Sequence, residues 1–210
     1  MKFIIAKKLE MSQRFRADGT VVPVTLLQAG ACTVTQVKTE DKDGYTAVQI
    51  GCGKEKHPTK PLAGHLKGAG ANFKTLKEFR VEDAGTLAVG GTVDASQFQP
   101  GEFVEVSGVS KGKGFQGVVK RHHFRGGPRT HGHKDNLRMP GAIGSGGMQR
   151  VFKGMRMGGH MGVDQVTVKN LEVIEVDAAK GILAVKGAVP GAHGSVVLVS
   201  GGTESKKSWN

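Results

Sequence analysis

Cysteine is scarce in this sequence, and a long apolar run is missing. The 210 residues contain only Cys32 and Cys52, without a Cys-x-x-Cys pair, which argues against a disulfide-rich secreted domain. The two could pair, but we expect buried free thiols in a cytosolic protein. No apolar run approaches the roughly 20 residues that cross a bilayer, and the N-terminal MKFIIAKKLEMSQRF becomes polar too soon for a secretory signal. We therefore expect a cytoplasmic protein without a membrane partner.

Aromatic residues are also few, at nine Phe, one Tyr and one Trp, whereas glycine is abundant, at 33 residues. So much glycine among scattered Val and Thr does not suit a helical bundle. It suits a barrel with many tight turns, or an irregular extended segment. A chain of this length can form one ordinary domain with a sizeable core, or one domain plus an extension.

Acidic residues are nearly absent from the middle of the chain. Residues 111–160 contain 11 Lys and Arg and one acid, Asp135, so they carry +10 of the chain's net charge of +12. They also hold 13 glycines and five of the eight histidines, and their apolar residues have no sustained period of 2 or 3.6. Such a segment buries too little apolar surface to offset its own ordering entropy, so it needs an external scaffold. Phosphates would screen its charges and release counterions, which predicts a nucleic-acid partner.

Short Val- and Thr-rich segments flank the basic segment and predict β-strands. They are FIIAKKL, VVPVTLLQ, CTVTQVKT, YTAVQIG, GTLAVGGTVDA and EFVEVSGVS before it, and VTVKNLEVIEVDA, GILAVKGAV and SVVLVSGG after it. ADG (17–19) and KDG (42–44) are expected hairpin turns. We interpret the chain as mainly β, with one closed antiparallel barrel formed by 1–110 and 163–204, a small partly helical insertion at 58–80, a long irregular Gly-rich basic extension at 111–162 and a loose tail at 205–210.

Gly112, Gly114 and Gly117 have the G-x-G-x-x-G spacing of a dinucleotide-binding turn. That turn must be followed by a helix whose N-terminus receives the pyrophosphate. The segment that follows, VVKRHHFRGGPRTHGHK, is β-branched and then broken by Gly and Pro, so we expect no amphipathic helix there, and Asp135 does not stand at a strand end. A P-loop is excluded because Gly114 stands where Ser or Thr is required. We expect no cofactor and no small-molecule substrate, and interpret the three glycines as backbone that approaches phosphates closely.

The histidines of the basic segment do not have the pattern of a metal site. Zinc requires three or four preformed ligands, and here no Cys is near and the neighbouring Lys and Arg would repel the cation. Histidines in this setting more readily stack on bases or bind phosphate and 2′-hydroxyl groups. We expect no catalytic residue either, because Ser110 and Ser145 have no evident base and acid partners. The Gly- and Met-rich run 139–162 could form a peptide-binding groove, but its small residues better suit a thin finger in a phosphate-lined crevice.

The junction between barrel and extension resembles the family of the third protein of the large ribosomal subunit, in its bacterial form. The family pattern is a Phe, six residues, an Asp or Asn, a small residue, Ser or Thr, and G-K-G-x-x-G-x-x-x-R. It is matched here by Phe98, Glu105, Gly108, Ser110, Gly112, Lys113, Gly114, Gly117 and Arg121. Glu105 replaces the usual Asp or Asn and keeps the charge. The resemblance covers nearly the whole chain, including VVPVTLLQAGACTVTQVKTEDKDGYTAVQIG, HGHKDNLRMPGAIG, VFKGMRMGGHMG and VTVKNLEVIEVD.

The resemblance implies a six-stranded translation-protein-type β-barrel with a long extension that penetrates the ribosomal RNA toward the peptidyl transferase centre. It implies a structural constituent of the large subunit that binds 23S ribosomal RNA near its 3′ end, acts early in assembly, neighbours large-subunit proteins fourteen and nineteen, and is no enzyme. One departure lies between Gly144 and Val151, where SGGMQR is one residue shorter than is usual in the family. A Gln of this loop is methylated in some bacteria, but Gln149 does not align with it, so the modification is not carried over.

The expected RNA-binding residues are the cations and histidines of the extension. They are Lys111, Lys113, Lys120, Arg121, His122, His123, Arg125, Arg129, His131, His133, Lys134, Arg138, Arg150, Lys153, Arg156 and His160. Their contacts should be mostly to phosphate and 2′-hydroxyl groups, because the major groove of A-form RNA is inaccessible. Two other functions stay open at this point: a nicotinamide-dependent enzyme that uses the Gly112–Gly117 turn, and a general nucleic-acid-binding protein outside the ribosome.

Overall fold

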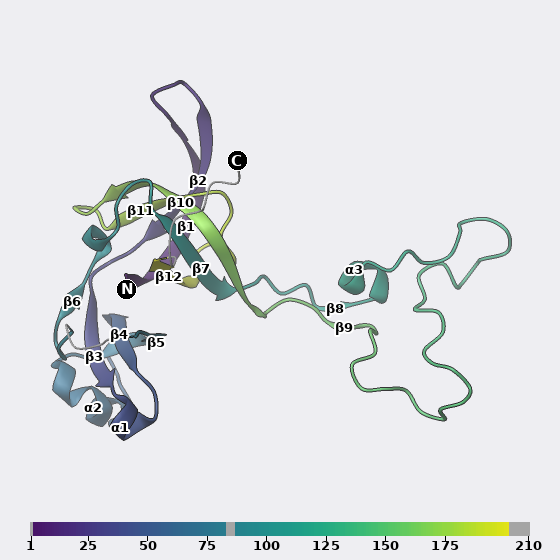
Figure 1. Cartoon of the computed structure of the whole chain (residues 1–210), viewed down its shortest axis with the longest axis horizontal. Helices are drawn as coiled ribbons and strands as arrows, with labels where there is room; N and C mark the ends of the chain where they lie inside the picture. The colour runs from purple at the N-terminus through teal and green to yellow at the C-terminus, as the bar shows by residue number, and fades with distance from the viewer. Residues whose placement is uncertain (1, 83–86, 202–210) are drawn as a thin grey trace. The chain divides into compact units, whose positions relative to one another are not determined.

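The chain folds into two compact units, which a computed structural model describes over residues 2–82 and 87–201 (Figure 1). The first unit comprises the residues up to Val109 and those from Gln165 onward, and the second comprises Ser110–Asp164. We call the second unit the arm. The chain is mainly β, as its sequence pattern predicts. No helix in the described ranges is long and apolar enough to span a membrane.

Six strands of the first unit pair in a closed ring. Its order is β1 (Phe3–Phe15), β12 (Val196–Gly201), β7 (Phe103–Val109), β10 (Gln165–Asp177), β11 (Ile182–Lys186) and β2 (Val21–Gln28), and β2 pairs again with β1. All six pairings are antiparallel. Register shifts occur between Lys8 and Met11, between Val168 and Leu171, and between Val173 and Glu175. Such bulges bend strands, which helps a short ring of strands to close.

The turn at 17–19 joins β1 and β2, as its Ala-Asp-Gly sequence predicts. The Arg16 amide donates to the Thr20 carbonyl at 3.0 Å, and Gly19 has a φ of 81°. A left-handed conformation costs glycine little, so the residue fits its place. This β1–β2 hairpin extends beyond the ring of strands in Figure 1.

Two segments expected in the barrel, CTVTQVKT and YTAVQIG, lie elsewhere, so this prediction is wrong. They form β3 (Cys32–Lys38) and β4 (Ala47–Lys54) of a separate four-stranded sheet with the order β5-β4-β3-β6. The insertion expected at 58–80 is helical only in α2 (Lys60–His65) and the 3₁₀ turn η1 (Leu66–Ala69). Its last part is β5 (Phe73–Arg80), which pairs with β4. Alternating hydrophobicity identifies a strand but not the sheet to which it belongs.

The remaining differences concern turns and ends. KDG (42–44) lies in the connection of a hairpin, as expected, because β3 and β4 pair antiparallel with Lys38 opposite Ala47. The connection is longer than a tight turn, since Glu40–Asp43 form the short helix α1, which ends at Gly44 with a φ of 76°. The segment GTLAVGGTVDA was expected as a strand, and its first two residues lie outside the described residues. In the rest of it, only β6 (Thr92–Val93) and the start of the 3₁₀ turn η2 (Ala95–Gln97) are regular secondary structure. The tail expected at 205–210 also lies outside the described residues.

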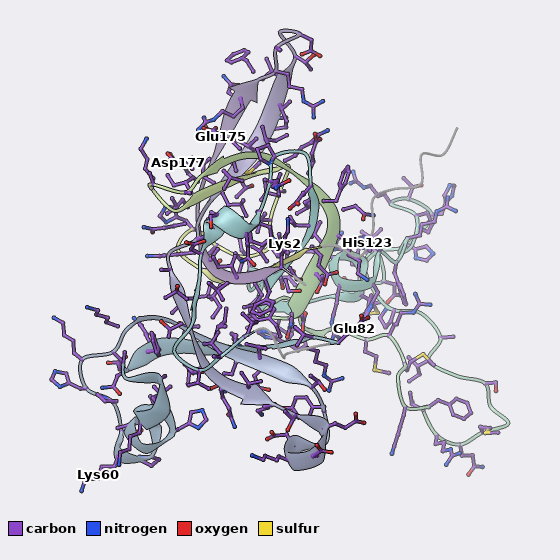
Figure 2. The ribbon with its side chains drawn as sticks, turned by 60° about the vertical axis from the view of Figure 1, so that its left-hand side comes forward. Lys2, Lys60, Glu82, His123, Glu175 and Asp177 are labelled. Carbon is purple, nitrogen blue, oxygen red and sulfur yellow. The ribbon has the colours of Figure 1, made fainter. Side chains whose placement is uncertain are left out.

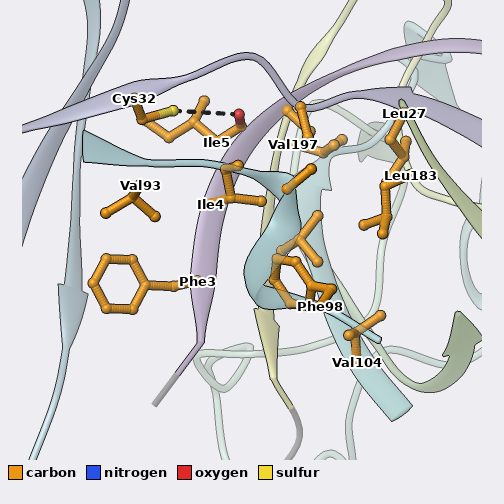
Figure 3. Packing of buried hydrophobic residues seen from close by; sticks show 14 of the residues in the cluster. Phe3, Ile4, Ile5, Leu27, Cys32, Val93, Phe98, Val104, Leu183 and Val197 are labelled. Atoms are coloured by element: carbon orange, nitrogen blue, oxygen red, sulfur yellow. Dashed lines mark hydrogen bonds between the residues drawn. The ribbon is translucent and has the colours of Figure 1, made fainter. Parts of the chain in front are cut away.

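One hydrophobic core joins the barrel to the four-stranded sheet (Figure 3). Ile4 and Val104 of the barrel belong to the same buried cluster as Val34 and Ile50 of the sheet. The ring of Phe3, on β1, stacks on the ring of Phe79, on β5, with centroids 4.8 Å apart. Burial of apolar surface is the dominant stabilising term in folding, so we expect the barrel and this sheet to fold as one body.

Candidate nucleic-acid interface

Two antiparallel segments form the base of the arm, which we call the ribbon (110–116 and 159–164). Its strands are β8 (Phe115–Gln116) and β9 (Gly159–His160), with Phe115 opposite His160. The Ser110 amide donates to the Asp164 carbonyl at 2.8 Å, and the Lys113 amide donates to the Met161 carbonyl at 2.9 Å. Backbone pairing therefore fixes where the loops of the arm begin and end.

The three glycines of the G-x-G-x-x-G spacing have different surroundings. A Cβ added at Gly112 would lie 3.0 Å from Cγ2 of Val163, and Gly114 has a φ of +67°. The ribbon itself thus favours glycine at both positions, through a close side chain at Gly112 and a left-handed backbone at Gly114. Gly117 has a φ of −72°, and a Cβ there would meet nothing within 4 Å. Neither the backbone conformation nor the space within the arm therefore explains why residue 117 is a glycine.

Directly after Gly117 the chain forms the short helix α3 (Val118–His122), where the sequence predicted no amphipathic helix. The helix forms because Val118 is buried and because the arm supplies partners for its polar side chains. Nη1 of Arg121 donates to the carbonyl of Met157 at 2.9 Å, and Nε2 of His122 lies 3.0 Å from the same oxygen. Two of the expected RNA-binding residues thus also hold the backbone at Met157 in place next to α3.

Beyond α3 the chain turns back on itself and borders an open pocket of about 710 Å³, which we call the hollow. The Gly127 amide donates to the Leu137 carbonyl at 2.9 Å, and a Cβ at Gly126 would overlap the same oxygen. Besides glycine and apolar residues, the lining includes an aromatic ring, a cation and two polar side chains, which suit a stacked base with phosphates nearby. The lining residues are Phe124, Arg125, Gly126, Gly127, His133, Asn136, Met139, Pro140 and Gly141.

Most of the expected RNA-binding side chains are exposed; one of them, His123, is labelled in Figure 2. Arg121 and His122 are the partly buried ones. All ion pairs found among the described residues belong to the first unit. Within the described arm, no Lys or Arg has a carboxylate partner. The exposed residues are Lys111, Lys113, Lys120, His123, Arg125, Arg129, His131, His133, Lys134, Arg138, Arg150, Lys153, Arg156 and His160.

The structure adds aromatic side chains that the sequence analysis did not select. Phe115 is 80% exposed and Phe152 is 48% exposed. Cζ of Arg150 lies 5.7 Å from the ring centroid of Phe152, and Cζ of Arg156 lies 5.8 Å from that of Phe124. Exposed rings beside cations are stacking platforms for unpaired bases. The signal in the sequence that could have identified these rings is the presence of Phe in a basic stretch with almost no acidic residues.

The arrangement offers positive charge, hydrogen-bond donors and ring faces. In the described part of the chain, no three His, Cys, Asp or Glu side chains come together as they would around a metal ion. The chemistry that the arm can provide is the recognition of a phosphate backbone and of exposed bases.

Known proteins resemble this chain over nearly its whole length. Residues 78–182 match the family model described as Ribosomal protein L3. The chain is 51% identical over 197 residues to a protein of Dehalococcoides mccartyi (93% of this chain and 96% of that one), and 50% identical over 207 residues to one of Herpetosiphon aurantiacus (97% and 98%). A protein of Solibacter usitatus is 54% identical over 202 residues (93% and 96%). All three are named Large ribosomal subunit protein uL3. With matches of this extent, the chain belongs to the ribosomal protein L3 family.

Proposed function

We propose that this protein is a structural constituent of the large ribosomal subunit and that its arm binds ribosomal RNA. The observation that carries the proposal is the uncompensated charge of the arm. Residues 111–160 carry a net +10, and their exposed cations have no acidic partner within the described arm. The relatives, whose name assigns them to the large ribosomal subunit, support the same role.

In this proposal the arm binds phosphates through its cations and contacts bases through its rings. Lys111 and Lys113 flank Gly112 on the ribbon, and both side chains are exposed. Phosphates around the arm would replace the missing carboxylates and release condensed counterions, a favourable contribution that weakens as salt rises. The exposed rings would stack on bases that are not paired.

The finer assignments rest on the family resemblance. We infer that the partner is 23S ribosomal RNA near its 3′ end, that the protein joins early in assembly, and that the arm reaches toward the peptidyl transferase centre. We infer large-subunit proteins fourteen and nineteen as neighbours. The activity is structural rather than enzymatic, and the site of action is the large subunit of the cytoplasmic ribosome.

A salt titration tests the phosphate contacts directly. Binding of the full chain to a large-subunit RNA fragment should fall linearly in log K against log [salt]. Lys153→Gln should weaken binding at every salt concentration and lower the slope by about one, because one phosphate contact is lost. Lys42→Gln is the matched control, since Lys42 is exposed on α1 in the first unit. A slope near zero for the wild type, or the same change for both variants, contradicts the proposal.

The alternative is a nucleic-acid-binding protein outside the ribosome, since cations and rings bind many polyanions. Sedimentation of a cell lysate separates the two possibilities. The proposal requires the protein to sediment with the large subunit, and its absence from that peak would favour the alternative.

A further inference from the structure

The two cysteines of the chain stand opposite each other on neighbouring strands. Thr33 of β3 pairs with Gly51 of β4, so one step further the antiparallel register brings Cys32 opposite Cys52. Directly opposed side chains lie on the same face of a sheet, with Cβ atoms about 4.5–5.5 Å apart. Both side chains indeed pack on the same hydrophobic cluster.

The two thiols differ in environment. Both cysteines are free, as the sequence analysis expects, but Cys32 is buried whereas Cys52 is partly exposed. Sγ of Cys32 lies 3.7 Å from the Ile5 carbonyl oxygen (Figure 3). The interaction between the two thiols lowers the pKa of Cys52 below its ordinary value and, together with burial, raises the pKa of Cys32. At neutral pH the accessible member of the pair is thus the better nucleophile.

We propose that Cys32 and Cys52 are a cross-strand dithiol that a low-molecular-weight disulfide, such as oxidised glutathione, converts into an intramolecular disulfide. The Cys52 thiolate attacks one sulfur of the external disulfide and expels one glutathione thiolate. Cys32 then loses its proton and attacks the Cys52 sulfur, which expels the second glutathione thiolate. Overall the protein loses two electrons and two protons, and one external disulfide becomes two thiols.

The geometry favours this second step over a lasting adduct. A disulfide needs Cα atoms about 4.4–6.8 Å apart, a separation that opposed residues of an antiparallel pair provide. Because the register of β3 and β4 places Cys32 opposite Cys52, the mixed disulfide would form with its resolving thiol on the neighbouring strand. The new bond would join the start of β3 to the last part of β4, at the end of this strand pair opposite α1.

The test uses the full-length chain, oxidised glutathione, and alkylation followed by intact-mass and peptide analysis. We expect the wild type to lose both free thiols and two hydrogen atoms, to yield a peptide pair linked through Cys32 and Cys52, and to recover both thiols with dithiothreitol. A wild type that stays unmodified, or that ends as a stable glutathione adduct at Cys52, overturns the proposal.

Two variants identify the roles of the two thiols. Cys32→Ala removes the resolving thiol, so Cys52 should retain one glutathione as a mixed disulfide. Cys52→Ala removes the accessible thiol, so the buried Cys32 should remain unmodified on the same timescale. Circular dichroism reports whether each variant is folded. If Cys32→Ala does not fold, the wild-type result still decides the proposal. Equal modification of both variants would contradict the assigned roles.

Discussion

Glycine serves two purposes in the arm, and individual positions separate them. Gly162 has a φ of +83°, and a Cβ there would overlap the Lys111 carbonyl oxygen, so only glycine lets the two sides of the ribbon approach. Gly117 has neither constraint, because its φ is −72° and the space around a Cβ is empty. Empty space beside exposed backbone is available to a partner.

At Gly117 we therefore predict an effect on binding without an effect on folding. Gly117→Ala should leave the circular dichroism of the free protein unchanged and weaken RNA binding about fivefold, or ~1 kcal/mol, because the methyl group keeps a phosphate from the backbone amides. Gly30→Ala is the matched control, since Gly30 is in the first unit and also has open space around its Cα. Unchanged affinity for Gly117→Ala would show that no phosphate approaches there.

Among the elements, the four-stranded sheet carries a polar network on β3, β4 and β5. Nζ of Lys38 lies 2.9 Å from Oε1 of Glu78 and donates to the Tyr45 hydroxyl at 2.7 Å. The Tyr45 hydroxyl donates to Oε2 of Glu78 at 2.8 Å, and the amide of Gln49 donates to Oε1 at 3.2 Å. The hydrogen bond from Lys38 is the largest cause that holds the pKa of Glu78 below its ordinary value of 4.5.

This network predicts a loss of stability in acid. A carboxyl group with a lowered pKa in the folded state contributes stability above its unfolded pKa, and the contribution is lost as pH falls through the folded value. Because Glu78 is 34% exposed, the contribution should be small, at most about 1 kcal/mol. Urea denaturation at about pH 7 and about pH 3 should show a smaller drop in the free energy of unfolding for Glu78→Gln than for the wild type.

The exposed carboxylate Glu10, on β1, provides the control for that measurement. Glu10→Gln should retain the acid-dependent drop of the wild type. If both variants lose the same amount of stability between the two pH values, the network does not contribute as described.

The elements also show how far a single sequence can be interpreted. The Val-rich composition of EFVEVSGVS identified β7 as a strand, on which Val104 and Val106 are buried between partly exposed neighbours. Cys32–Lys38 was recognised as a strand as well, but its partner was not, because pairing depends on contacts distant in the sequence. In the arm, charge revealed the cations. Neither charge nor periodicity could show that Arg121 turns inward to the Met157 carbonyl, since that contact depends on the fold of the loop.

At the scale of the molecule, the two units differ in what stabilises them. The first unit has a continuous buried core, whereas Val118 is the one apolar residue of the described arm that is classed as buried. A segment with so little buried apolar surface has little free energy to oppose its opening. The arm should therefore depend on its partner for order.

Hydrogen exchange of the free and the RNA-bound protein measures this difference. In the free protein, amides of 141–156 should exchange at nearly unprotected rates, whereas those of Val104 and Val106 should exchange at least about a thousandfold more slowly. RNA binding should slow exchange in the arm and leave the barrel nearly unchanged. Strong protection of 141–156 in the free chain would mean that the arm is ordered without RNA.

The pairing of β7 with β10 has a topological consequence. Val109 stands opposite Gln165, and the Ser110 amide donates to the Asp164 carbonyl. The arm therefore begins and ends at two paired residues of neighbouring strands and has no free end. A loop without a free end can enter an opening only as two chain segments side by side, which requires a width of at least ~10 Å. If ribosomal RNA surrounds the arm, as we propose, a narrower passage in that RNA would have to form around the arm after it has arrived. The connectivity of this hairpin would then require the protein to be in place before the surrounding RNA closes.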